Sequence, residues 1–119
     1  MIEKSIPIFI GYDDRETIAF HVCSNSLIRR SSMPLAIHPL ALNILRDYQE
    51  QHTDGSNKFI YSRFLVPYLM GFQGHAIFVD GDMLVRSDIS ELWEQRNDSL
   101  AVSVVKHDYQ TKASVKYLG

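Results

Sequence analysis

The sequence predicts an α/β fold built on a largely parallel sheet with flanking helices. Two observations support this class: short apolar runs suited to buried strands, and helical spacing in the segments between them. The chain has 119 residues, of which 45% are hydrophobic and 22% charged, as in an ordinary globular protein with one core. The sequence shows no internal repeat and no low-complexity tract. We therefore expect residues 1–119 to form one domain.

The first predicted elements are a strand and a helix. Residues 6–10 are apolar and partly β-branched, and Gly11 stops the run, which suits a buried strand. Residues 16–30 follow with helical spacing. The apolar face of this helix is expected to contain Ala19, Cys23 and Leu27, with Ile18 and Val22 beside them.

The middle of the chain predicts a second strand, a short helix and a loop. Residues 35–42 form the strand, and Pro39 makes it an edge strand or an irregular one. Residues 43–51 are interpreted as a short helix with Asn43 as its cap. Residues 52–58 are polar and contain Asp-Gly, so we expect a loop there.

The remaining elements alternate in the same way. Residues 59–70 are a helix candidate that Pro67 should kink or shorten. Residues 76–79 are predicted to be a strand, and 90–94 a helical turn with Ser87 or Asp88 near its start. Residues 100–105 are continuous enough in apolar character to predict a strand buried on both faces.

Acidic residues follow two of the predicted strands. Asp13 and Asp14 follow the first strand, and Asp80-Gly81-Asp82 follows strand 76–79. Ligands of parallel α/β sheets bind at these carboxyl ends. Neighbouring carboxylates repel one another, and a hard cation such as Mg²⁺ or Mn²⁺ removes that cost. Although a bare Asp-x-Asp is usually only a turn, its place after an apolar run favours a cation site able to hold a diphosphate.

Composition bears on partners and location. The formal net charge is -2 and the basic residues are scattered, which argues against nucleic acid as a partner. The single cysteine, Cys23, excludes an internal disulfide. The first residues lack the apolar core of a signal peptide, and no stretch approaches the roughly 20 apolar residues of a membrane span. We therefore expect a cytoplasmic protein without a membrane span.

Three segments together resemble a known family. Residues 77–93 run from an apolar strand into Asp-x-Asp, an apolar triplet and Asp-Ile-x-x-Leu-Trp; "YSRFLVPYL" (61–69) and "IFIGYDDRE" (8–16) lie upstream. In this combination the chain resembles the N-terminal, donor-binding part of GT-A fold glycosyltransferases of family 8, the glycogenin and lipopolysaccharide galactosyltransferase type. The resemblance implies a Rossmann-like nucleotide-diphospho-sugar transferase sheet. It also implies transfer of a sugar from a nucleotide-sugar, expected to be a UDP-sugar, to a carbohydrate or lipid-linked acceptor.

The resemblance also implies roles for individual residues. Asp82 should bind Mn²⁺ or Mg²⁺ directly, and Asp80 should contact the metal, the ribose or both. Arg63 should lie near the diphosphate or the donor sugar, where its planar guanidinium suits pairs of oxygens. The implied nucleotide-sugar-binding residues are Gly11, Tyr12, Asp13, Arg63, Asp80 and Gly81.

The chain departs from the family in length. Family members are usually more than twice as long, and their later half carries a histidine that completes the metal site. We therefore expect the donor half of a transferase, with an uncovered sheet edge that favours a homo-oligomer. Lys106, His107 and Asp108 follow the last predicted strand and are expected on the acceptor side. The remaining histidines show no metal-ligand spacing and are interpreted as structural: His21, His38, His52 and His75.

Two other functions remain open. In a haloacid dehalogenase-like phosphohydrolase, Asp80 would be the nucleophile and Asp82 the acid/base, but Gly-Thr normally follows where this chain has Met83-Leu84. The other alternative is a non-catalytic module that binds nucleotide-sugars. Only a transferase or such a module requires Asp13 and Asp82 to face one cleft, with Arg63 on its rim.

Overall fold

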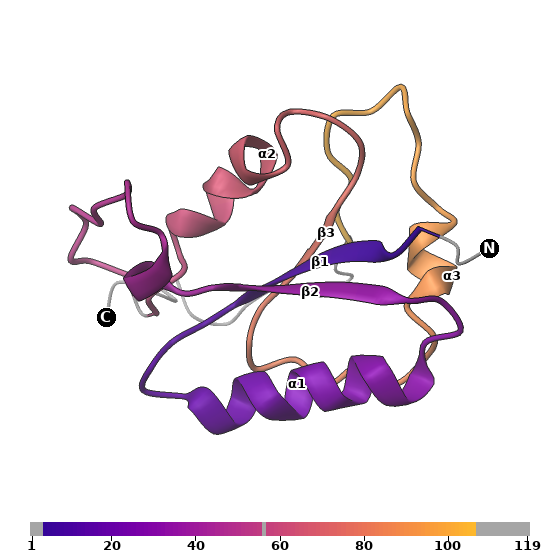
Figure 1. Ribbon diagram of the computed structural model, residues 1–119, viewed down its shortest axis with the longest axis horizontal. Helices are drawn as coiled ribbons and strands as arrows, with labels where there is room; N and C mark the ends of the chain where they lie inside the picture. Colours follow the sequence, from indigo (N-terminus) through magenta and orange to yellow (C-terminus); the bar gives the residue numbers. More distant parts are fainter. Residues whose placement is uncertain (1–3, 56, 107–119) are drawn as a thin grey trace.

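A parallel three-stranded sheet forms the centre of the protein in a computed structural model that describes residues 4–55 and 57–106. The strand order is β2-β1-β3 (Figure 1). The strands are β1 (Ile6–Gly11), β2 (Leu35–Leu40) and β3 (Ile77–Val79). All pairings are parallel, so the predicted α/β class is confirmed. The strand that contains Pro39 lies at an edge, where its missing N–H costs no ladder hydrogen bond.

Helix α1 (Thr17–Arg30) lies along one face of the sheet (Figure 1). Side chains alternate along a strand, so β1 directs every second residue toward this helix. The core between them consists of fully buried side chains from both elements, namely Ile6, Ile8, Ile10, Cys23 and Leu27. Full burial of each large one contributes about 1.5–3 kcal/mol. Ile18 and Val22, expected beside the apolar face, are instead 77% and 49% exposed, so the buried stripe of the helix is narrower than predicted.

The opposite face of the sheet carries aromatic rings. Phe9 is buried and stacks on His38, with ring centroids 4.6 Å apart. Phe78 of β3 is the register partner of Phe9. The ring centroids of Phe59 and Phe78 lie 6.3 Å apart. This face therefore presents an aromatic layer beside the carboxyl ends of β1 and β3.

The predicted helix over residues 43–51 is wrong. Only a short 3-10 turn forms there, η1 (Leu42–Ile44), and Asn43 lies within it without capping it. The carboxylate of Glu50 accepts hydrogen bonds from the Tyr48 hydroxyl at 2.8 Å and from the backbone N–H of His52 at 2.9 Å. Such local bonds from side chains compete with helical backbone bonds.

The predicted helix over residues 59–70 is divided and shortened. It consists of the 3-10 helix η2 (Ser62–Leu65) and the single turn α2 (Val66–Leu69). Pro67 lies in the first turn of α2, where its missing N–H has no intrahelical partner to lose.

The strand predicted over residues 100–105 is also wrong. This segment is not part of the sheet, and Val102 and Val104 are 77% and 83% exposed. Apolar character alone does not make a strand, because a strand needs a neighbour for its backbone hydrogen bonds. Within the described ranges, β3 pairs only with β1.

The last helix, α3 (Ser90–Trp93), begins just after Asp88, close to the position expected. The Asp88 carboxylate accepts the backbone N–H groups of Ser90 at 3.0 Å and of Ser32 at 3.1 Å, which joins α3 to the end of α1. None of the helices in residues 4–55 and 57–106 has the length and apolar character that crossing a bilayer requires.

Candidate functional site

The Asp80-Gly81-Asp82 turn lies at the carboxyl end of β3. The pairing of Ile10 with Val79 places Gly11 and Asp80 at the same edge of the sheet. A Cβ added to Gly81 would lie only 2.2 Å from the carbonyl oxygen of Gly11. The two strand ends therefore touch through their backbones, and only glycine at position 81 permits this contact.

Buried Ser26 of α1 holds the chain just beyond this turn. Its hydroxyl accepts the backbone N–H of Val85 at 2.9 Å and donates to the carbonyl of Cys23 at 2.7 Å. The turn itself is closed by the N–H of Met83, which donates to the carbonyl of Asp80 at 3.3 Å. These bonds fix the backbone that presents the two carboxylates.

The two carboxylates differ in their surroundings. Asp82 is exposed, whereas the Asp80 side chain is 41% exposed, with its Oδ1 buried and without a hydrogen bond. A guanidinium nitrogen of Arg63 lies 3.3 Å from this oxygen, close enough for an ion pair although the hydrogen-bond geometry is not met. The Oδ1 atom of Asp80 thus lies beside the Arg63 guanidinium and can still accept a hydrogen bond or bind a metal ion.

This pair of carboxylates fits a divalent cation whose remaining ligands are phosphate oxygens of a bound molecule and water. Mg²⁺ is usually bound through one or two carboxylates, with phosphate oxygens and water completing its shell. Among the described residues, no three His, Cys, Asp or Glu side chains are grouped to enclose a metal ion. The buried Oδ1 of Asp80 and the exposed carboxylate of Asp82 are candidate oxygen ligands at this edge of the sheet.

Two aromatic rings and a carbonyl surround the Arg63 guanidinium. Its central carbon lies 5.0 Å from the centroid of Phe78 and 5.7 Å from that of Phe59. Its Nε donates to the carbonyl of Phe59 at 3.3 Å. Cation–π contacts of this kind hold the guanidinium in one place. Arg63 therefore faces Asp80 from a defined position.

Phe59 covers Gly11. The ring is buried, and a Cβ added to Gly11 would lie 2.3 Å from its nearest ring carbon. Gly11, which the family resemblance places against the nucleotide, lies beneath this ring in the structure. Sequence reasoning did not single out Phe59, because the contact joins residues far apart in the chain and no local pattern marks it.

Asp13 is buried and accepts several hydrogen bonds. It accepts from the backbone N–H of Arg15 at 3.0 Å, from the Arg15 guanidinium at 2.9 and 2.6 Å, and from the backbone N–H of Lys58 at 3.2 Å. The side-chain hydrogen bonds from Arg15 lower the pKa of Asp13 to about 2, although burial acts in the opposite direction. The neighbouring Tyr12 packs edge-on against Phe20, with centroids 5.4 Å apart.

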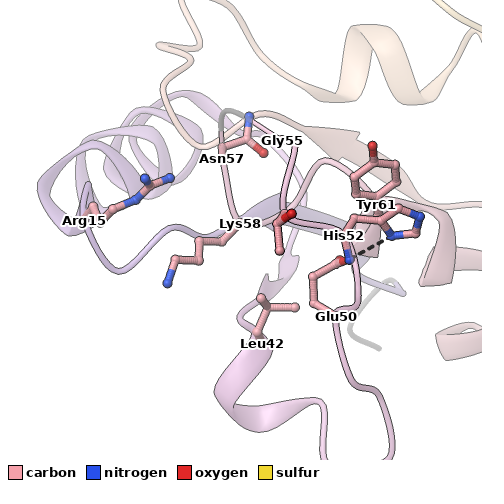
Figure 2. A pocket seen from close by; sticks show the side chains of 9 residues that line it. Arg15, Leu42, Glu50, His52, Gly55, Asn57, Lys58 and Tyr61 are labelled. Carbon is pink, nitrogen blue, oxygen red and sulfur yellow. Dashed lines mark hydrogen bonds and ion pairs between the residues drawn. The ribbon is translucent and has the colours of Figure 1, made fainter. Parts of the chain in front are cut away.

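A small hollow lies beside these strand ends. Its volume is about 170 Å³, and it is lined by Arg15, Leu42, Glu50, His52, Thr53, Gly55, Asn57, Lys58 and Tyr61. Figure 2 shows Arg15 on one side and the stacked rings of His52 and Tyr61 on the other, with centroids 3.8 Å apart. Most of the lining residues lie in the segment that the sequence predicted to be a loop. The sequence did not predict the hollow, because its lining side chains come from three separate segments.

The structure thus brings together some of the predicted site residues. Gly11, Gly81, Asp80 and Arg63 meet at the ends of β1 and β3, and Asp82 is exposed beside them. Tyr12 and Asp13 lie at the same edge but contact Phe20 and Arg15. Lys106 is exposed and outside any helix or strand. His107 and Asp108 lie outside the described residues.

A parallel sheet with Asp-x-Asp directly after β3, beside the end of the central strand β1, is that of a GT-A-like domain, the fold of a class of glycosyltransferases. The chain belongs to glycosyl transferase family 8, since the sequence model of that family matches residues 8–117. Enzymes of this family generally use divalent cations and take a nucleotide-sugar donor and an acceptor. This membership removes the phosphohydrolase alternative.

A curated relative extends this comparison. Over 121 aligned residues the chain is 41% identical to Protein CDI of Arabidopsis thaliana, and the alignment covers 98% of this chain and 47% of that protein. The chain therefore spans about half the length of this relative. No solved structure matches the chain.

Proposed function

We propose that this chain binds the nucleotide-sugar donor of a family 8 glycosyltransferase through its diphosphate. Asp80 and Asp82 would hold Mn²⁺ or Mg²⁺, and Arg63 would pair with phosphate oxygens. The observation that carries the proposal is the buried Oδ1 of Asp80, which has no hydrogen bond and lies 3.3 Å from Arg63. The ion pair with Arg63 uses only part of the acceptor capacity of this oxygen, and a bound cation would use the rest.

Each residue contributes a distinct element to this site. When bound, the cation supplies positive charge that stabilises the diphosphate as it leaves the sugar. The planar guanidinium of Arg63 suits two phosphate oxygens at once and is held by Phe59 and Phe78. Gly81 lets the Asp-x-Asp turn lie against β1, and in the proposed site both carboxylates would face the strand end where ligands of parallel sheets bind.

The nucleoside would extend from Asp80 past Tyr12 toward the hollow beside β1 and β2. That hollow, about 170 Å³, is smaller than the roughly 300–1,000 Å³ of common ligand pockets, so it would hold only part of the donor. His52 and Tyr61 stack on each other, and an outer face of this pair would suit a planar base. We propose a UDP-sugar as donor and a carbohydrate or lipid-linked acceptor, with Lys106, His107 and Asp108 on the acceptor side.

Thermal unfolding of the full chain with UDP tests this proposal. In Mn²⁺, UDP at about 100 times its dissociation constant should add roughly 2.7 kcal/mol of stability, and EDTA should remove most of that gain. Asp82→Asn should abolish the Mn²⁺-dependent part, while Asp47→Asn, at an exposed carboxylate elsewhere, should behave as the wild type. Equal shifts with Mn²⁺ and with EDTA would contradict the proposal. Transfer or hydrolysis of a UDP-sugar then distinguishes an enzyme from a non-catalytic binding module.

A further inference from the structure

We propose that Phe59 is a positioning residue for the donor diphosphate, because its ring rests on the bare backbone of Gly11 and holds Arg63 toward Asp80. This role rests on the proposed function. It also gives Gly11 a function that differs from the one implied by family resemblance: Gly11 would act on the ligand site through Phe59.

The Phe59 ring packs against the backbone of Gly11 and lies near that of Gly81. Three ring carbons lie 2.3–2.5 Å from the place where a Gly11 side chain would begin, and one ring carbon lies 3.9 Å from the corresponding place at Gly81. Any side chain at position 11 would displace the ring. Because the buried ring covers Gly11, a ligand approaching this strand end would meet the partly exposed Arg63 side chain that the ring holds.

The backbone of Phe59 is held by side chains that precede it. Its N–H donates to the Asn57 side chain at 3.1 Å, and the adjacent N–H of Lys58 donates to Asp13 at 3.2 Å. Since Asp13 lies two residues beyond the end of β1, these bonds relate the position of the ring to the sheet. The ring is therefore placed independently of Arg63.

Phe59 contacts Arg63 in three ways. Its carbonyl accepts the backbone N–H and the Nε–H of Arg63, each at 3.3 Å, and its ring lies 5.7 Å from the guanidinium carbon. An arginine side chain without such contacts samples many rotamers. A guanidinium held in advance meets the diphosphate with less loss of freedom.

A ring that only fills the core would act differently from a ring that positions Arg63. Core filling affects the stability of the whole chain, whereas positioning affects the part of the ligand that Arg63 touches. The affinity of UDP relative to that of UMP isolates this part, because the two nucleotides differ only in the terminal phosphate. Calorimetric titration of the full chain with each nucleotide in Mn²⁺ measures that ratio.

Phe59→Leu should weaken UDP binding by about tenfold, in line with the loss of a partly buried cation–π contact, and leave UMP binding within about twofold. In an Arg63→Gln background, Phe59→Leu should change the UDP-to-UMP ratio no further, because the residue on which the ring acts is gone. Phe64→Leu is the matched control, since Phe64 lies in the same segment and is 76% exposed. It should keep the wild-type ratio.

An unchanged ratio in Phe59→Leu, or an effect that adds fully to that of Arg63→Gln, would overturn the positioning role and leave the proposed function standing. A wild-type chain that binds no UDP would overturn both. Should Phe59→Leu fail to fold, Asn57→Ala, which removes the acceptor of the Phe59 N–H, must lower the ratio. A wild-type ratio in that variant would equally overturn the role.

Discussion

Asp13 accepts the backbone N–H of Lys58 at 3.2 Å, across 45 residues of sequence. This bond joins the end of β1 to the segment that carries Phe59 and Arg63. An acidic residue that the family resemblance assigns to the nucleotide thus holds the backbone behind the candidate phosphate-binding arginine. Its four hydrogen bonds identify it as a structural element of the site.

Asp13→Asn should lower the free energy of unfolding by about 1–3 kcal/mol, because a buried charged acceptor of four hydrogen bonds is replaced by a neutral amide. Urea denaturation measures this change. Asp14→Asn is the control, since the Asp14 side chain is 67% exposed and pairs with Lys58 at 3.3 Å at the surface. That variant should lose no more than about 1 kcal/mol. Equal losses in both variants would contradict the structural role of Asp13.

The stability of the chain should depend on pH through the same carboxylate. The pKa of Asp13 is lowered from 3.8 to about 2 in the folded chain. The ionised form is therefore favoured by folding, so its contribution is complete above about pH 4 and is lost as the pH falls toward 2. Urea unfolding at several pH values between 5 and 2 should show a shallower decline in Asp13→Asn than in the wild type. Parallel curves would argue against the lowered pKa.

Gly81→Ala should destabilise the chain on steric grounds. The added Cβ would lie 2.2 Å from the carbonyl oxygen of Gly11, so one of the two backbones must move. We expect a loss of about 1–3 kcal/mol, typical of overpacking, in urea denaturation. Gly55→Ala is the comparison, because the nearest atom there, a methyl carbon of Ile60, lies 3.1 Å away and leaves more room than the 2.2 Å at Gly81. A loss at Gly81 no larger than that at Gly55 would count against the close contact of the strand ends.

The exposed apolar segment 100–105 should promote self-association. Val102 and Val104 are 77% and 83% exposed, and exposed apolar patches favour contacts between chains. Sedimentation velocity at high micromolar concentration should show a homo-oligomer for the wild type and a smaller species for a Val102→Lys, Val104→Lys double variant. Ile18→Lys, at a position 77% exposed on α1, should leave the oligomer unchanged. A monomeric wild type would contradict this prediction.

Local patterns predicted the elements whose structure depends on local interactions. The apolar run 6–10 and the helical spacing of 16–30 became β1 and α1 with small changes at their ends. Segment 100–105 was predicted wrongly because strand formation depends on a neighbour, which apolar character does not reveal. The helix predicted over 43–51 failed because side-chain bonds to Glu50 replaced helical ones.

In the candidate site, too, local patterns in the sequence predicted some features, whereas contacts between distant segments could not be predicted. Strand ends in the sequence predicted that Asp13 and the Asp80-Gly81-Asp82 turn would lie at one edge of the sheet, and the parallel pairing of β1 with β3 places both strand ends there. That Asp13 and Asp82 face one cleft, with Arg63 on its rim, stays a prediction. The contact of Phe59 with Gly11 and the bond between Lys58 and Asp13 join distant segments. No local sequence pattern predicts such contacts. The burial of Gly11 and Asp13 could therefore be seen only in the structure.

The central claim is that Asp80 and Asp82 bind a divalent cation, which in turn binds the diphosphate of the donor. Calorimetric titration with UDP tests this claim most directly. The titrations compare wild type, Asp82→Asn and the exposed control Asp47→Asn, each in Mn²⁺ and in EDTA. We predict that removing Mn²⁺ weakens UDP binding at least about tenfold, or about 1.4 kcal/mol, in the wild type and the control. Asp82→Asn should bind UDP equally weakly in both conditions. Tight binding that is the same in Mn²⁺ and EDTA, or Mn²⁺ dependence retained by Asp82→Asn, would contradict the account.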